Sequence, residues 1–241
     1  MERDAYLSFI RGDAERMAAT ISDRTQHVPV ASCPGWDLRQ LVRHTGDVHR
    51  WATEAIRTAA RPGSPAVGAP ADASLASWIR DGAEALVQAL TDADPAAPTW
   101  HPFPFEQKVW VWSRRQAQET AMHRWDAEMA AVGSSSLDPV LACDGVEEYL
   151  ELALPRVLSR EKVAAPTSSL RVRCTDVAGD WLLVNDDGRC AVSTEPRPAD
   201  AVITGPAESL LLVLMGRTQR STIEIEGDAS AADSWLSLPG F

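Results

Sequence analysis

Hydrophobic residues recur at helical spacing along the first part of the chain. Leu7, Ile10, Met17 and Ile21, for example, fall on one face of a helix. The same pattern predicts four amphipathic helices, over residues 4–22, 38–59, 75–91 and 106–131. Asp37 follows a Pro-Gly break and can cap the second of them. Four such helices joined by moderate loops predict a four-helix bundle.

A fifth helix is predicted over residues 138–158, and the pattern changes after it. Short stretches rich in branched residues and separated by turn residues predict strands, within 169–176, 180–187, 189–195 and 221–228. Two further helices are predicted, over 206–216 and 230–238. The expected fold class is therefore a helical domain (residues 1–158) followed by a small α+β domain (residues 159–241).

Charge and composition narrow the function classes. The formal net charge is -11, and no basic stripe is present, so nucleic acid and anionic membrane surfaces are disfavoured partners. No apolar run is long enough to span a membrane, and the charged N-terminus lacks the apolar core of a signal peptide. These features predict a cytoplasmic protein.

The cysteine and lysine usage adds two expectations. The four cysteines, Cys33, Cys143, Cys174 and Cys190, form no CxxC pair, so we expect reduced core residues. Lys108 and Lys162 are the only lysines among 23 basic residues. Because arginine codons are GC-rich, this bias indicates a GC-rich source genome.

Two polar residues stand out on the inner side of the fourth predicted helix. Glu119 and His123 are four residues apart, about 40° round a helix, and Trp112 shares their stripe. On the second predicted helix, His44 shares a stripe with Leu41, Val48 and Trp51, whereas His49 lies about 140° away and is expected to face outward. His44, Glu119 and His123 are therefore predicted to meet inside the bundle.

Two imidazoles and one carboxylate form the ligand set of catalytic zinc sites that keep an open coordination position. The same set also forms the facial triad of non-haem iron oxygenases, for which no other feature speaks. The structural alternative is a hydrogen-bonded Glu119–His123 pair at a wet edge of the bundle. Asp126 either orients a histidine of the site or is a surface acid.

Two stretches, CPGWDLRQLVRHTGDVHRW (33–51) and QETAMHRWDAE (118–128), resemble the mycothiol-dependent maleylpyruvate isomerase family. The Pro-Gly-Trp turn with a histidine eight residues after the tryptophan matches at Trp36 and His44, and the Glu-x-x-x-His motif matches at Glu119 and His123. The fifth helix and the C-terminal part also resemble the family. The resemblance implies a DinB-like metal-binding bundle followed by a sterol-carrier-like α+β domain.

The resemblance further implies that His44, Glu119 and His123 bind a divalent metal, usually zinc, with nickel or iron as alternatives. It also implies mycothiol as thiol cofactor and hence an actinobacterial source, with which the GC-rich bias agrees. The expected activity is that of an isomerase or S-transferase acting, as a monomer or homodimer, on a small anionic activated substrate. The alternative is a non-catalytic module that binds a structural metal or an apolar ligand.

The characterised family member uses an arginine of the C-terminal domain, and Arg217 is the candidate here, with Arg220 beside it. Arg217 follows a strongly apolar helix that Gly216 can end in a left-handed turn. A guanidinium presented in this way suits a substrate carboxylate. The structural alternative is that Arg217 caps the C-terminus of its own helix.

Overall fold

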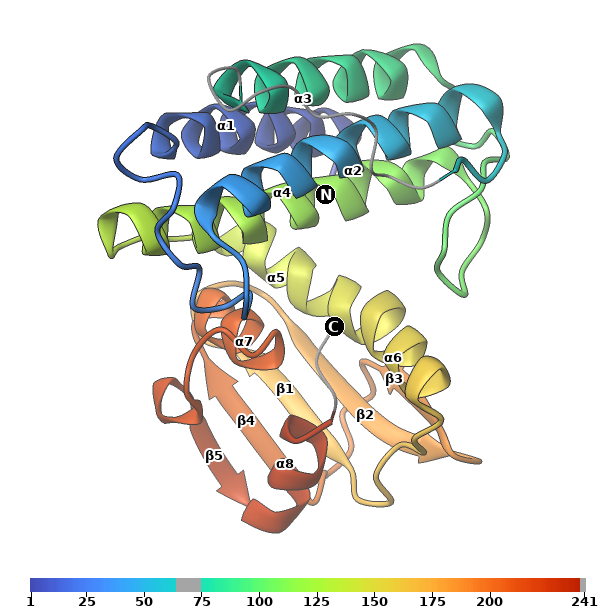
Figure 1. The fold of residues 1–241 in the computed structure, drawn as a ribbon. Helices are drawn as coiled ribbons and strands as arrows, with labels where there is room; N and C mark the ends of the chain where they lie inside the picture. The colour runs from blue at the N-terminus through green and yellow to red at the C-terminus, as the bar shows by residue number, and fades with distance from the viewer. Residues whose placement is uncertain (64–74, 239–241) are drawn as a thin grey trace. The chain divides into compact units, whose positions relative to one another are not determined.

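A computed structural model describes residues 1–63 and 75–238 (Figure 1). The chain forms two compact units, one made of residues 1–102 and 106–136 and the other of residues 103–105 and the chain from Leu137 onward. The expected helical domain followed by a small α+β domain is confirmed. No helix in the described part of the chain combines the length and the apolar character that a membrane span needs.

The first unit is a bundle of four helices. They are α1 (Arg3–Thr20), α2 (Leu38–Thr58), α3 (Leu75–Asp92) and α4 (Val109–Val132). α1 packs against α3 and α4, and α2 packs against the same two helices. The bounds agree with the predicted helices to within three residues at each end, because amphipathic periodicity and capping residues are local signals.

The ends of α2 and α4 have clear local causes. Asp37 accepts a hydrogen bond from the Gln40 backbone N–H at 2.9 Å, and the Gln40 side chain accepts one from the Asp37 backbone N–H at 2.9 Å. This reciprocal capping box begins α2 as the sequence predicted. α4 ends at Gly133, whose φ of 82° is a left-handed conformation that glycine adopts without steric cost.

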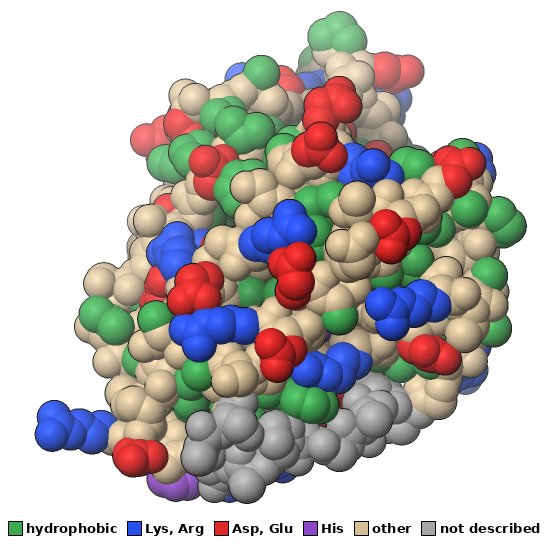
Figure 2. All heavy atoms as spheres, turned by 90° about the horizontal axis from the view of Figure 1, so that it is seen from above, with side chains coloured by type: hydrophobic (Ala, Val, Ile, Leu, Met, Phe, Trp, Pro, Cys, Tyr) green, Lys and Arg blue, Asp and Glu red, His purple; other side chains and the backbone are tan. Residues whose placement is uncertain are grey.

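Charged side chains on the bundle surface are paired rather than gathered by sign. Acidic and basic side chains are interspersed on the face shown in Figure 2. Two ion pairs join α1 to α3: Arg11 lies 2.9 Å from Glu84, and Arg80 lies 2.6 Å from Glu15.

The second unit begins with a helical segment and continues with a sheet. The segment comprises α5 (Pro139–Glu148), a π-helical turn η2 (Tyr149–Ala153) and α6 (Leu154–Glu161). α5 packs against α7 and α6 packs against β3, both in the second unit. The boundary between the units therefore falls at 136/137, earlier than the 158/159 boundary expected from composition.

The sheet has the order β3-β2-β1-β4-β5, in which only the β1–β4 pair is parallel. Its strands are β1 (Leu170–Cys174), β2 (Asp180–Asp186), β3 (Arg189–Ser193), β4 (Ala201–Gly205) and β5 (Glu224–Gly227). The helices of this part are α7 (Ala207–Leu214), the 3-10 turn η3 (Arg220–Thr222) and α8 (Ala229–Leu236). β4 was not predicted from the sequence.

Candidate metal site

Three polar side chains of the first unit meet between α2 and α4. His44 comes from α2, and Glu119 and His123 come from α4. Both histidines direct Nε2 toward the same carboxylate oxygen: Glu119 Oε1 lies 3.2 Å from His123 Nε2 and 3.6 Å from His44 Nε2. One potential ligand atom from each residue lies within 4.8 Å of the other two. The structure thus brings together the three residues that the sequence singled out.

The placement of this group follows from helix geometry and packing. Glu119 and His123 share a face of α4 because they are four residues apart. His44 lies at the edge of the buried face of α2, and its side chain is 35% exposed, against 15% for Glu119 and 13% for His123. The group therefore lies at the rim of the bundle core, where a small ligand could reach it.

His123 is held from its other side by Asp126. His123 Nδ1 lies 3.0 Å from Asp126 Oδ2, and the Asp126 side chain is fully buried. Cys33 Sγ lies 3.9 Å from the same oxygen, and this thiol is free and half-buried. A carboxylate that accepts the Nδ1 proton leaves Nε2 with a lone pair directed at the site. Of the two roles left open for Asp126, this geometry supports the orienting one.

The charges within the group are strongly coupled. Burial would raise the pKa of Glu119, but His123, His44 and Arg115 together hold that pKa well below its ordinary value. Burial would lower the pKa of His123, but Glu119, Asp126 and Cys33 raise it well above its ordinary value. Glu119 and His123 therefore each favour the charged form of the other. A metal ion bound at His123 Nε2 would take the place of a proton on that atom.

A residue with a permanent charge, Arg115, also contacts the group and was missed by the sequence analysis. Its Nη2 atom donates a hydrogen bond to Glu119 Oε2 at 2.7 Å, and the Arg115 side chain is only 6% exposed. Arg115 is four residues before Glu119, so helical spacing was the signal that could have identified it. Glu119 thus has one oxygen facing the histidines and the other facing an arginine.

The turn before α2 places an aromatic ring beside the site. Gly35 takes a φ of 85°, and the Trp36 backbone N–H donates to the Cys33 carbonyl at 3.0 Å. The Trp36 ring contacts the His44 ring edge-on, with centroids 4.9 Å apart. An open groove of about 510 Å³ adjoins this turn. It is lined by Pro29, Val30, Ala31, Pro34, Gly35, Trp36, Asp37 and Gln40.

His49 lies in the core of the bundle, so the prediction that it faces outward is wrong. Its side chain is fully buried, and Nε2 lies 2.8 Å from Thr120 Oγ1 of α4. The buried face of α2 is wider than one stripe, because this helix packs against both α3 and α4. Burial lowers the pKa of His49 to about 3, which makes the ring neutral at pH 7.

Arg217, the candidate for binding an anionic substrate, belongs to the second unit. It follows α7, and its Nη1 atom donates a hydrogen bond to the Met215 carbonyl at 2.8 Å. Met215 is the C-terminal capping residue of α7, and Gly216 takes a φ of 70°. This contact is the one that a helix-capping role requires. A role in substrate binding stays a prediction.

Comparisons with known proteins match both units. A family model described as the mycothiol maleylpyruvate isomerase N-terminal domain matches residues 9–128, and the model of the corresponding C-terminal domain (MDMPI) matches residues 140–234. No curated protein matches the chain at a significant level.

Among solved structures, the mycothiol-dependent maleylpyruvate isomerase superposes with a TM-score of 0.64 at 12% identity, over 95% of each chain. A point variant of that isomerase gives a TM-score of 0.65 at 10% identity, again over 95% of each chain. At this identity the similarity to these structures establishes the fold alone.

Proposed function

The chain belongs to the mycothiol maleylpyruvate isomerase family, and on that premise we propose that it is a metal- and thiol-dependent enzyme. Its activity is that of an isomerase or an S-transferase, its thiol is mycothiol, and its substrate is a small, activated, anionic molecule. The observation that carries the proposal is the convergence of His44 Nε2, His123 Nε2 and Glu119 Oε1.

The donor set fits a divalent metal ion. Ligands bound at about 2.0–2.1 Å in tetrahedral geometry lie about 3.3 Å apart. The distances from Glu119 Oε1 to the two Nε2 atoms, 3.2 and 3.6 Å, bracket that separation. Imidazole and carboxylate suit zinc, and they also suit nickel and iron. We propose zinc, because the family resemblance favours it.

Each residue has a definable role in this proposal. His44, His123 and Glu119 would hold the ion, and Asp126 would keep His123 in the tautomer whose Nε2 carries the lone pair. When bound, the metal would supply Lewis acidity that keeps a thiol in its thiolate form at neutral pH. If that thiolate added to an activated double bond, rotation and elimination of the thiolate would give the isomer. Protonation of the adduct, by the proton that the thiol released, would instead give S-transfer.

The alternative function is a binding module with a structural metal. Structural zinc sites are closed by four protein ligands, whereas catalytic sites use three. Within residues 1–63 and 75–238, the group at this point has three members, His44, Glu119 and His123. Cys33 and Asp126 form a second group with His123, and Asp126 approaches it on the Nδ1 side. The three-residue set favours an open, catalytic site.

The remaining parts of the proposal rest on composition and family. We propose a cytoplasmic protein of an actinobacterial source that acts on a small molecule, as a monomer or homodimer, without nucleic acid as partner. The net charge of -11 supports the last of these points.

Metal analysis of the purified full chain tests the function. We expect about one divalent ion per chain, retained on gel filtration and lost in His44→Ala and His123→Ala. His27→Ala is the matched control, because His27 is an exposed histidine paired with Asp37. Metal-free protein that takes up no zinc would contradict the proposal. Mycothiol and an activated alkene, offered to the metal-loaded protein, then separate isomerase from S-transferase by the product formed.

A further inference from the structure

The two oxygens of Glu119 have different partners. Oε1 faces the two histidines, at 3.2 and 3.6 Å, whereas Oε2 accepts a hydrogen bond from Arg115 at 2.7 Å. A carboxylate can bind a metal through one oxygen or through both, and binding through both takes up an additional coordination position. The arginine occupies the oxygen that binding through both would use.

The order and spacing of this pair contribute little to helix stability. For charged residues four apart on an isolated helix, the favoured order has the acid first, and here the arginine comes first. The side chains are only 6% and 15% exposed, so both charges are largely desolvated. Desolvation of an ion pair offsets much of its attraction, which makes such a pair a poor device for stability alone.

We propose that Arg115 is a positioning residue of the metal site: it holds Glu119 Oε2, so that Glu119 offers only Oε1 and coordination positions stay open for thiol and substrate. The inference rests on the proposed function. An arginine suits this role because it stays protonated at every physiological pH and its planar fork fixes the carboxylate plane.

The charge of Arg115 has a second consequence. Glu119 contributes one negative charge to the site, and the guanidinium beside it offsets that charge. More of the positive charge of a bound metal is then available to attract anions. Both a thiolate and an anionic substrate would bind more tightly for this reason.

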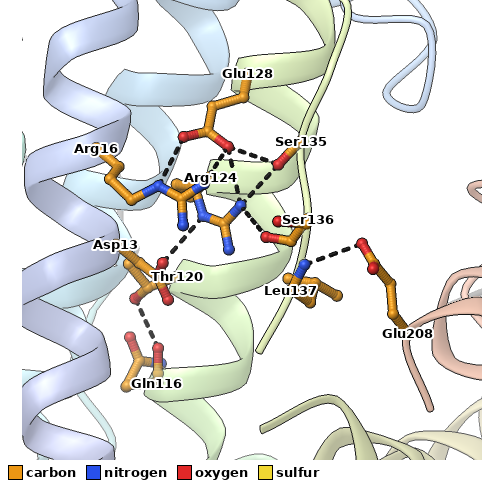
Figure 3. A network of polar contacts seen from close by, with 10 residues as sticks. All are labelled: Asp13, Arg16, Gln116, Thr120, Arg124, Glu128, Ser135, Ser136, Leu137 and Glu208. Carbon is orange, nitrogen blue, oxygen red and sulfur yellow. Dashed lines mark hydrogen bonds and ion pairs between the residues drawn. The ribbon is translucent and has the colours of Figure 1, made fainter. Parts of the chain in front are cut away.

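α4 supplies a matched control for this proposal. Arg124 and Glu128 form a second buried pair with the same order and spacing, at 2.9 Å. The other partners of Arg124 are Asp13, Ser135 and Ser136 (Figure 3). Arg124→Met therefore removes a buried arginine from the same helix and leaves the Arg115–Glu119 contact in place.

The test uses the full chain loaded with Co²⁺, whose visible absorption reports coordination number. 2-Mercaptoethanol serves as the thiol probe and is titrated through the thiolate-to-cobalt charge-transfer band. For Arg115→Met we expect weaker visible bands, because Glu119 is free to bind through both oxygens, and thiol affinity lowered by about 10–100-fold. Arg115→Lys, which keeps the charge and a donor, should restore most of the thiol affinity. Arg124→Met should leave both signals unchanged while it lowers stability.

The inference would be overturned if Arg115→Met had the same Co²⁺ spectrum and the same thiol affinity as the unmodified protein. If Arg115→Met does not fold, Arg115→Gln replaces it, with the same expected loss of thiol affinity and the same outcome against the proposal. Failure of the proposed function is a separate result: the unmodified protein would then bind no Co²⁺, or His44→Ala would bind it equally well.

Discussion

Helix α4 carries two buried Arg–Glu pairs of the same spacing, and their surroundings differ. Glu128 accepts hydrogen bonds on both oxygens: Oε1 from Arg16, and Oε2 from Arg16, Arg124 and Ser135 (Figure 3). Glu119 accepts one from Arg115 on Oε2, and its Oε1 faces two histidines. Arginine is a permanent cation, whereas histidine can release its proton to become a metal ligand.

We interpret this as the difference between a structural polar cluster, around Glu128, and the proposed metal site, around Glu119. Around Glu128 the protein supplies permanent donors to both oxygens, and the network joins α1, α4 and the segment at Ser135. Around Glu119 two of the three partners, His44 and His123, are groups that a metal ion can replace as the source of positive charge. A carboxylate whose partners can exchange a proton for a metal is the better candidate for a ligand.

The largest expected effect comes from neutralising each glutamate in turn. We expect Glu119→Gln to lower zinc affinity by at least about 100-fold, because an amide oxygen is a much weaker ligand than a carboxylate. Glu128→Gln should keep the metal and lower stability instead. Chelator competition and urea unfolding of both variants measure the two effects. Loss of metal from both variants alike would remove the distinction between the clusters.

Removal of the arginine of the Glu128 cluster is expected to have the next largest effect. Arg124 is 2% exposed and pairs with Asp13 and Glu128. Arg124→Met leaves the buried Asp13 and the partly buried Glu128 without this partner, so we expect a loss of about 3–5 kcal/mol in the free energy of unfolding. Urea unfolding at pH 7 gives the value. Arg16→Gln is the control, because the Arg16 side chain is 49% exposed and its loss should cost less than about 1 kcal/mol. Equal losses of stability in the two variants would contradict the interpretation that the buried Arg124, rather than the exposed Arg16, stabilises the Glu128 cluster.

His49 is a further histidine of the bundle, with a ring nitrogen that lacks a hydrogen-bond partner among the described residues, and it tests whether such a nitrogen is enough to identify a metal ligand. Its Nδ1 atom is buried without a hydrogen-bond partner in the described chain, yet the residue lies in the core. Its pKa of about 3 in the folded protein is below the ordinary 6.5. Below pH 6.5, His49 therefore binds a proton in the unfolded chain, whereas in the folded protein it stays neutral down to a pH of about 3. The stability contribution is complete above pH 6.5 and falls as the pH drops toward 3.

Between pH 6.5 and 5, this single group should cost about 2 kcal/mol of stability. His49→Gln should flatten that part of the profile, and metal content should not change. Urea unfolding at several pH values measures the slope, and His27→Gln is the exposed-histidine control. An unchanged slope in His49→Gln would mean that the buried ring does not resist protonation.

The smallest expected effect on stability is at Arg217, in the second unit. Its hydrogen bond to the Met215 carbonyl is part-buried, so Arg217→Met should lower the free energy of unfolding by about 1 kcal/mol and leave the metal bound. Turnover of an anionic substrate by Arg217→Met tests whether Arg217 also binds the substrate. Activity lost at an unchanged content of folded, metal-loaded protein would assign Arg217 to substrate binding. If each folded molecule of the variant keeps its activity, the role of Arg217 is only to cap the C-terminus of α7.

The sequence by itself determined the elements whose causes are local. Amphipathic periodicity located the four bundle helices, and Asp37 marked the start of α2 by a cap that involves only neighbouring residues. The spacing of Glu119 and His123 placed them on one face for the same reason, since residues four apart adjoin on any helix. His44 was identified as their partner from its stripe, and the structure places it beside them.

Only the tertiary structure decided which groups are buried and what they contact. His49 is buried because α2 packs on two neighbours, and β4 is a strand because it pairs with β1, thirty-one residues earlier in register. α5 belongs to the second unit because it packs on α7. The roles proposed for Arg115 and Asp126 depend on which of their atoms face the site and which lose contact with water. Such contacts are set by packing between distant segments, which local periodicity does not encode.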